Sequence, residues 1–259
     1  MITSFSDAGL LWELPLLFIT GLVAGFVDSI AGGGGLITLP MILSLGGDPQ
    51  VSLGTNKLQA MFGSASATWH YAKAGAVKLT DCWRGCLITF IGAIIGTLGV
   101  RQIGPNTLKV IIPLLLIAVA IYSLRNPNLG EHEAKPRIER WRFDLMCGLA
   151  LGFYDGFFGP GTGTFWTMAF VIVMGFNLTR ATAYTKAMNF SSNVCSFLVF
   201  AIAGQVNYFA GTVMGIGQLI GARIGSGMVM TRGTKFIRPV FITVVLLITA
   251  KLLYDAYLK

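Results

Sequence analysis

The sequence predicts an all-α integral membrane protein built from two related halves in inverted orientation. Composition gives the first reason. Of the 259 residues, 54% are hydrophobic and only 12% are charged, whereas an average soluble domain has roughly 25% charged residues. The apolar residues form long runs, several near the 18 or more that cross a hydrocarbon core about 30 Å thick. A soluble protein with a very large core does not fit, because too few polar residues remain to cover it.

An internal repeat gives the second reason. The stretches "GFVDSIAGGGGLIT" (25–38) and "GFYDGFFGPGTGTF" (152–165) each place an aspartate and a glycine-rich turn inside an apolar run. Further matches follow at nearly the same spacing: Lys57 with Lys186, "IGAIIG" with "IGQLIG", and "LKVIIP" with "TKFIRP". The chain is therefore predicted to comprise a first membrane repeat over 1–124, a charged cytoplasmic linker over 125–142 and a second membrane repeat over 143–259.

Each half contains five apolar segments. In the first half they cover about 10–31, 36–45, 55–72, 82–100 and 107–124, and in the second half about 143–158, 163–175, 182–203, 208–230 and 236–257. The second segment of each half is too short to span a bilayer comfortably. We expect it to be the return arm of a re-entrant or broken helical hairpin with the glycine-rich stretch at its tip, which leaves about eight transmembrane helices.

Positive charges favour the inverted arrangement of the repeats. With 73–84, the linker, the region of Arg180 and 231–238 in the cytoplasm, that side holds 12 Lys and Arg and the opposite side holds 4. A parallel repeat with both termini inside gives 10 against 6. Because cytoplasmic loops are enriched in Lys and Arg, the inverted arrangement is favoured and both termini are expected on the periplasmic side.

Several other classes of protein fit poorly. Cys82 and Cys86 lie four residues apart, while Cys147 and Cys195 stand alone. This spacing matches neither a zinc cluster nor a disulfide framework, so no metal or other cofactor is expected. The net charge of +8 is scattered through short loops, a distribution that marks the cytoplasmic side of a membrane protein rather than a nucleic-acid partner. Residues 1–13 contain no Lys or Arg, so no cleavable signal peptide is expected.

The two glycine-rich turns are the first candidate for a binding site. Broken helices in inverted repeats are typical of secondary transporters, whose substrates bind near the bilayer midplane. The interruptions free peptide N–H groups, which can face an anion; Gly33, Gly34 and Gly161 are the candidate residues. Close helix packing is the alternative explanation for glycine, and it suits "GAIIG" (92–96) and "GARIG" (221–225) better than four glycines in a row.

Two lysines within apolar segments are the second candidate. A charge at the centre of a membrane helix costs about 2.5–3.5 kcal/mol on insertion scales, yet Lys57 and Lys186 occupy matching positions of the repeat. Snorkelling to an interface is the alternative. Thr182, Lys186, Asn189 and Asn193 recur at helical spacing and share one face.

Amide side chains accompany Lys57 as well, since Asn56 and Gln59 lie beside it in the sequence. A lysine surrounded by amide donors suits a small oxyanion, which would be the partner of this site. Asp28 and Asp155 could neutralise the lysines, carry a coupled proton, or act only as helix caps and fixed ion-pair partners. The sequence leaves these roles open, as it does the presence of a homo-oligomer.

The sequence suggests other functions as alternatives to transport. Ser64 or Ser66 with His70 could suggest an intramembrane serine hydrolase, but Ser66 and His70 lie four apart on one helix, whereas a catalytic pair normally joins separate elements. An anion channel stays an alternative, and a cation channel or carrier is a further one, in which acids would outnumber bases at the site. The sequence favours a carrier that is not an enzyme.

The motifs "AGFVDSIAGGGG" with "TNKLQA" (55–60), and "GFYDGFFGPGTG" with "KAMNFSSN" (186–193), resemble the TauE/SafE sulfite exporter (TSUP) family of bacterial inner-membrane proteins, and within it the YfcA-like branch. The resemblance covers essentially the full chain. It implies transport, usually export, of sulfite, sulfoacetate, related organosulfonates or carboxylates, and it leaves the individual substrate open.

Overall fold

The computed structural model describes residues 7–44, 48–108, 111–112, 114 and 133–233. This part of the chain contains no strand, and its helices are α1 (Asp7–Ala31), α2 (Gly34–Ser44), α3 (Pro49–Lys73), α4 (Leu79–Arg101), α6 (Arg140–Phe157), α7 (Thr162–Ile172), α8 (Leu178–Ile202) and α9 (Tyr208–Arg232), with further helical residues at 105–108, 111–112 and 114. The predicted segments 107–124 and 236–257, and most of the predicted linker, lie mainly or wholly outside the described residues.

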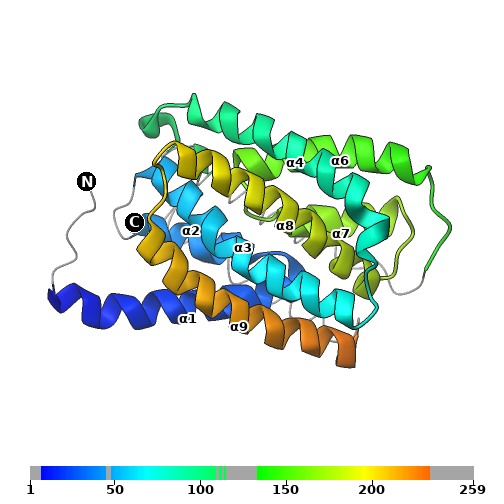
Figure 1. The fold of residues 1–259 in the computed structure, drawn as a ribbon, viewed down its shortest axis with the longest axis horizontal. Helices are drawn as coiled ribbons and strands as arrows, with labels where there is room; N and C mark the ends of the chain where they lie inside the picture. Colours follow the sequence, from blue (N-terminus) through cyan, green and yellow to red (C-terminus); the bar gives the residue numbers. More distant parts are fainter. Residues whose placement is uncertain (1–6, 45–47, 109–110, 113, 115–132, 234–259) are drawn as a thin grey trace.

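The helices fall into two corresponding sets, α1–α4 and α6–α9. The second helix of each set has 11 residues and the third has 25. Corresponding helices run in opposite directions along the long axis of the bundle: α3 and α9 run from left to right in Figure 1, whereas α8 and α4 run from right to left. This is the arrangement that an inverted repeat requires.

The helices begin up to six residues earlier than the hydrophobic pattern predicts, and in α3, α6 and α8 the added first turn contains polar residues. The third helix of each set starts at a capping residue: Asp48 accepts hydrogen bonds from the amides of Gln50 and Val51, and Asn177 accepts one from Arg180. Side-chain caps satisfy backbone donors that have no partner within the helix. Similarly, α6 begins at Arg140, within the stretch assigned to the linker.

One end of the bundle collects most of the described basic residues. It is formed by the α3–α4 loop, the starts of α6 and α8, and the end of α9 (Figure 1). Lys78 and Arg180, from the two different halves, line one surface pocket there, and Arg180 lies 3.4 Å from Glu133, which precedes α6. A parallel repeat would place the basic loops of the two halves at opposite ends, so their convergence agrees with the inverted arrangement.

Two close helix crossings join the halves. The first helix of each half runs parallel to the fourth helix of the other, α1 with α9 and α4 with α6. Glycines allow the backbones to touch: a Cβ atom on Gly221 would lie 1.9 Å from the carbonyl oxygen of Leu22, and one on Gly156 would lie 2.2 Å from that of Ala93. Small residues at such crossings are how membrane helices pack closely, as the sequence predicts for "GAIIG" and "GARIG".

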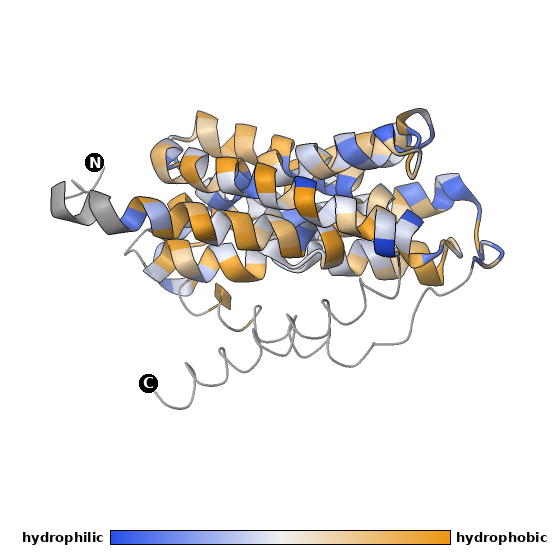
Figure 2. Ribbon diagram, turned by 90° about the horizontal axis from the view of Figure 1, so that it is seen from below, coloured by the Kyte–Doolittle hydropathy of each residue, from blue (hydrophilic) through white to orange (hydrophobic). Residues whose placement is uncertain are grey.

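The outer surface of the bundle is apolar. Leu87, Ile91, Ile95 and Leu98 recur along one exposed side of α4, and Ile216, Ile220 and Ile224 along one exposed side of α9. Figure 2 shows hydrophobic residues along the helices and hydrophilic residues gathered toward one end. By length and composition, residues 13–31, α4 and α9 can cross a membrane. An exposed apolar surface of this extent fits a lipid environment.

The central helices have the opposite character. The central helices α3 and α8 are each 25 residues long. Their lysines, Lys57 and Lys186, are only 1% and 0% exposed. The polar side chains therefore face inward and the surrounding helices shield them from lipid.

Replacement of Gly96 by Ala tests the α4–α6 crossing. The new Cβ would lie 2.0 Å from the carbonyl oxygen of Phe153, and overpacking of this kind costs about 1–3 kcal/mol. We expect Gly96→Ala to lower the unfolding midpoint of the purified protein in detergent. Gly99→Ala, on the same helix, is the matched control, since its Cβ would meet only a side-chain carbon of Phe157 at 3.9 Å. Equal midpoints for the two variants would contradict a tight crossing.

Candidate functional site

Two broken helices meet at the centre of the bundle. The turn between α1 and α2 contains Gly32, with φ of +79°, and the turn between α6 and α7 contains Gly161, with φ of +83°. Such left-handed backbone is readily adopted only by glycine. A Cβ atom on Gly32 would lie 2.4 Å from the carbonyl carbon of Gly163. The two turns therefore touch backbone to backbone rather than facing lipid separately.

Polar groups of the protein form hydrogen bonds with backbone N–H and C=O groups that the helix breaks leave without helical partners. The amide of Gly34, at the start of α2, donates to the Asp28 carboxylate at 3.1 Å. The Ala31 carbonyl accepts from Thr164 at 3.2 Å, and the Asp155 carbonyl accepts from Lys57. The N–H group of Gly34, which the sequence offers to an anionic substrate, is thus directed at Asp28.

Each buried lysine forms an ion pair with an aspartate of the other half. Lys57 Nζ lies 2.6 Å from Asp155 Oδ1, and both side chains are buried, at 1% and 5% exposure. Lys186 Nζ lies 2.8 Å from Asp28 Oδ2, where the lysine is fully buried and the aspartate is 18% exposed. The lysines do not snorkel. In this structure both aspartates are therefore ion-pair partners of the lysines, and the pairing does not test a role in carrying a proton.

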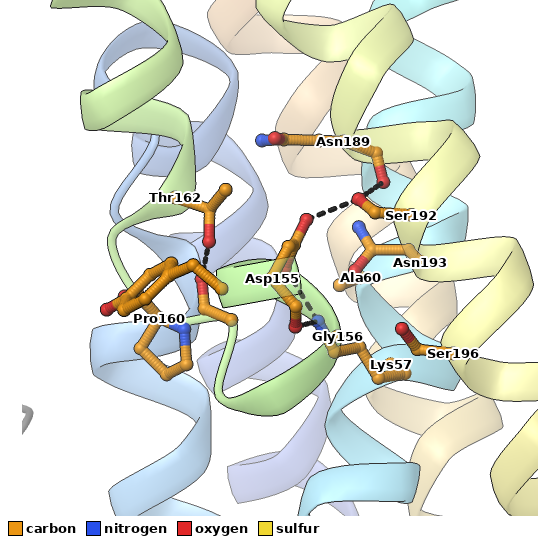
Figure 3. Close-up of polar contacts among 12 residues, drawn as sticks. Lys57, Ala60, Asp155, Gly156, Pro160, Thr162, Asn189, Ser192, Asn193 and Ser196 are labelled. Atoms are coloured by element: carbon orange, nitrogen blue, oxygen red, sulfur yellow. Dashed lines mark hydrogen bonds and ion pairs between the residues drawn. The ribbon is translucent and has the colours of Figure 1, made fainter. Parts of the chain in front are cut away.

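Asp155 is held from two sides. Figure 3 shows its carboxylate between Lys57 on α3 and Ser192 on α8, with Asn189 and Asn193 also projecting from α8. Ser192 Oγ donates to the second carboxylate oxygen. Three elements from both halves therefore converge on one carboxylate.

A small cavity of about 30 Å³ lies between the two ion pairs. Its walls combine both glycine turns, both aspartates and polar side chains of α3, α8 and α9: Asp28, Gly32, Gly35, Asn56, Lys57, Ala60, Asp155, Gly159, Gly161, Thr162, Gly163, Asn189, Asn193 and Gln218. The volume is on the order of two water molecules.

The structure separates the proposed site residues into two groups. Asn56, Lys57, Asn189, Asn193 and Gly161, together with both aspartates, line the cavity. Lys186, Gln59, Gly33 and Gly34 are not among its lining residues.

Gln59 belongs to a hydrogen-bond cluster. Its amide donates to Asn56 Oδ1 at 2.9 Å and to Thr38 Oγ1 at 3.0 Å. Thr38 in turn donates to Asn56 at 2.6 Å. The cluster fixes the orientation of Asn56 on α3 relative to α2.

Several residues of the site are not identified by the sequence analysis, and three of them make contacts that matter for its geometry. Gln218 lines the cavity from α9, Ser192 bonds Asp155 and Thr38 orients Asn56. Gln218 carried a signal, because it interrupts the glycine motif "IGQLIG" at the point where the first half has Ala93 in "IGAIIG".

The residues considered for a serine hydrolase are not brought together. Ser66 Oγ donates to the Leu219 carbonyl at 2.9 Å, and His70 Nδ1 lies 2.8 Å from Ser226 Oγ. Both contacts join α3 to α9.

A double-mutant cycle tests the Lys57–Asp155 pair. Removal of one partner leaves a buried charge without compensation, which costs about 3–5 kcal/mol, while apolar replacement of both partners is often nearly neutral. We therefore expect Lys57→Met and Asp155→Leu each to destabilise the protein strongly, and the double variant to recover most of the loss, measured by unfolding in detergent. Arg142→Met is the control, because its pair with Glu139 is exposed and worth about 1 kcal/mol at most. Additive losses would exclude direct coupling.

Comparison with known proteins supports a membrane transporter. The model of the family "Sulfite exporter TauE/SafE" matches residues 17–252. The chain is 45% identical to a "Probable membrane transporter protein" of Haemophilus influenzae over 93% of its length and 95% of the relative's. It is 44% identical to "Probable membrane transporter protein YfcA" of Escherichia coli, over 94% and 91%.

A more distant relative, "Probable membrane transporter protein YunE" of Bacillus subtilis, is 26% identical over 93% of this chain and 97% of its own. No solved structure matches. Since the family model and the similar relatives cover nearly the whole chain, the chain belongs to the TauE/SafE sulfite exporter family of membrane transporters.

Proposed function

We propose that this protein is a secondary transporter that exports small sulfur-containing oxyanions by alternating access, with each anion accompanied by a proton. Sulfite, sulfoacetate and other organosulfonates are the candidate substrates, and small carboxylates are a further class. The observation that carries the proposal is the pair of reciprocal ion pairs, Lys57–Asp155 and Lys186–Asp28, on the two sides of one cavity.

The charge balance of the site supports a coupled proton. Two ammonium and two carboxylate groups are paired, so they leave no net charge to attract an anion. A buried anion without compensation is strongly unfavourable. Protonation of one aspartate would release its lysine, and that lysine could then compensate the substrate. An anion and a proton would therefore enter together, which makes transport of a univalent anion electrically neutral.

The positions of the ion pairs support alternating access. Lys57 lies eight residues into α3 and Lys186 eight residues into α8, and these helices begin at opposite ends of the bundle (Figure 1). With a rise of 1.5 Å per residue, each lysine is about 12 Å from its own end. One pair would thus close each side of the cavity. Both pairs cross between the halves, so rocking one half against the other could open one pair at a time.

The size of the cavity supports a carrier rather than an open pore. About 30 Å³ holds on the order of two water molecules, so a sulfonate would need the cavity to widen. An anion channel is the alternative, and an intramembrane enzyme is the less favoured one.

We further place the protein in the bacterial inner membrane with its basic end in the cytoplasm and both termini on the periplasmic side, following the positive-inside rule. Cysteines introduced at the two exposed sites Lys78 and Gln102, at opposite ends of α4, test this orientation. In intact cells a membrane-impermeant maleimide should label Gln102→Cys and spare Lys78→Cys until the cells are opened. The reverse pattern would invert the assignment.

Proton coupling is tested in proteoliposomes with labelled methanesulfonate, which does not itself titrate near neutral pH. A pH gradient should drive its accumulation by the wild type, and preloaded substrate should accelerate entry, as expected of a carrier. Asn imitates a protonated aspartate, so Asp155→Asn or Asp28→Asn should retain exchange while losing several-fold or more of the gradient-driven accumulation.

Two controls sharpen this experiment. Lys57→Ala with Lys186→Ala should abolish both activities, because no cation would then remain to compensate the anion. Undiminished transport by that double variant would remove the lysines from the mechanism. Current through planar bilayers without acceleration by preloaded substrate would favour the channel.

A further inference from the structure

Two buried amide oxygens on the cavity wall lack hydrogen-bond partners among the described residues. Gln218 is 1% exposed and Asn189 is 6% exposed, yet neither Gln218 Oε1 nor Asn189 Oδ1 has a partner within the described part of the chain. An unsatisfied buried polar atom costs about 1–3 kcal/mol. Both residues line the cavity between the ion pairs, where water can donate to these oxygens or, after a half-turn of the amide, an oxyanion can accept from the N–H groups.

A third amide lies beside them. Asn193, on the same helix as Asn189, is 7% exposed, and within the described residues its side chain makes a long contact of 3.5 Å from Nδ2 to Ser64 Oγ. A carboxamide presents two donors on one side and an acceptor on the other, and a half-turn exchanges them. The three side chains can therefore direct several N–H donors at an oxyanion without contributing charge.

Three of the amides on the cavity wall, Asn189, Asn193 and Gln218 (the amide wall), come from the second half, and a fourth, Asn56, comes from the first. At the offset that aligns Lys57 with Lys186, Asn189 corresponds to Ala60 and Asn193 to Ser64, while Gln218 corresponds to Ala93 in the glycine motif. Ala60 and Gly35 line the cavity from the first half. At these three positions the second half therefore has amide side chains where the first half has smaller ones, although the scaffold is repeated.

Gly63 makes room for the Gln218 amide. A Cβ atom at Gly63 would lie 2.2 Å from Gln218 Oε1. Since that oxygen is the end of a flexible side chain, Ala at position 63 would displace the amide rather than separate the helices.

We propose that Gln218, with Asn189 and Asn193, binds the oxyanion head group of the substrate, and that the space beside the small lining residues Gly35 and Ala60 accepts a short apolar tail. The inference rests on the proposed transport function and narrows its substrates to univalent oxyanions with little or no tail, of which methanesulfonate is the probe. Gln218 is then a specificity-determining residue. The lysines compensate charge, whereas the amides recognise the head group.

Exchange of labelled methanesulfonate in proteoliposomes tests this assignment. Gln218→Met keeps the length of the side chain but cannot hydrogen-bond, and hydrogen bonds to charged groups are worth enough to raise the KM roughly tenfold or more. Gly63→Ala should raise the KM in the same direction without altering Gln218 itself. Neither variant should unfold more readily than the wild type, because the oxygen of Gln218 has no protein partner to lose.

The matched control is Gln205→Met. Gln205 lies in the α8–α9 turn, where Oε1 accepts from Arg101 at 3.0 Å, away from the cavity, so its KM should equal that of the wild type. Wild-type exchange with an unchanged KM in both Gln218→Met and Gly63→Ala would overturn the amide wall alone. Failure of the wild type to exchange or be stabilised by any small oxyanion would overturn the proposed function and this assignment together.

Discussion

The exchange of charges between the two halves is the constraint on which the rest of the structure depends. Lys57 finds its carboxylate on the second half and Lys186 finds its carboxylate on the first. Neither half alone could bury its lysine without leaving a charge uncompensated in an apolar environment, which is costly. The two halves therefore complete each other electrostatically, and the broken helices are needed because they carry the aspartates to the centre.

Helix packing reinforces the same dependence. The crossings of α1 with α9 and of α4 with α6 join helices of different halves through glycines that admit no side chain. Backbones this close cannot part without losing many contacts, so the halves cannot separate as rigid domains. Any change of access is restricted to small rotations about these crossings, and ion pairs of 2.6 and 2.8 Å are contacts that small rotations can make or break.

The sequence predicts the scaffold better than the site. Hydrophobic runs identify helices α1–α4 and α6–α9, and the repeated motifs identify the types of residue at the centre of the bundle. Both kinds of prediction depend on local sequence pattern. Which lysine meets which aspartate depends on how the halves interlock, and a linear spacing does not contain that information. The orientation of Gln59, whose amide donates to Thr38, is not predictable from the sequence for the same reason. The sequence does not identify Gln218 as a site residue, because it lies within a glycine motif whose other positions serve packing.

Symmetry is retained and lost at different places, and the difference is physically informative. Both halves contain a buried lysine, an aspartate, a broken helix and glycine crossings. Each feature is needed in both halves because each half supplies the partners of the other. Asn189, Asn193 and Gln218 have Ala60, Ser64 and Ala93 as their counterparts. A fully symmetric cavity would present identical walls to a head group and to a tail, and could not orient a substrate whose two ends differ. Recognition of such a substrate requires that the two halves differ at the cavity wall. Burial of the charges requires that the halves remain alike at the ion pairs a few ångströms away.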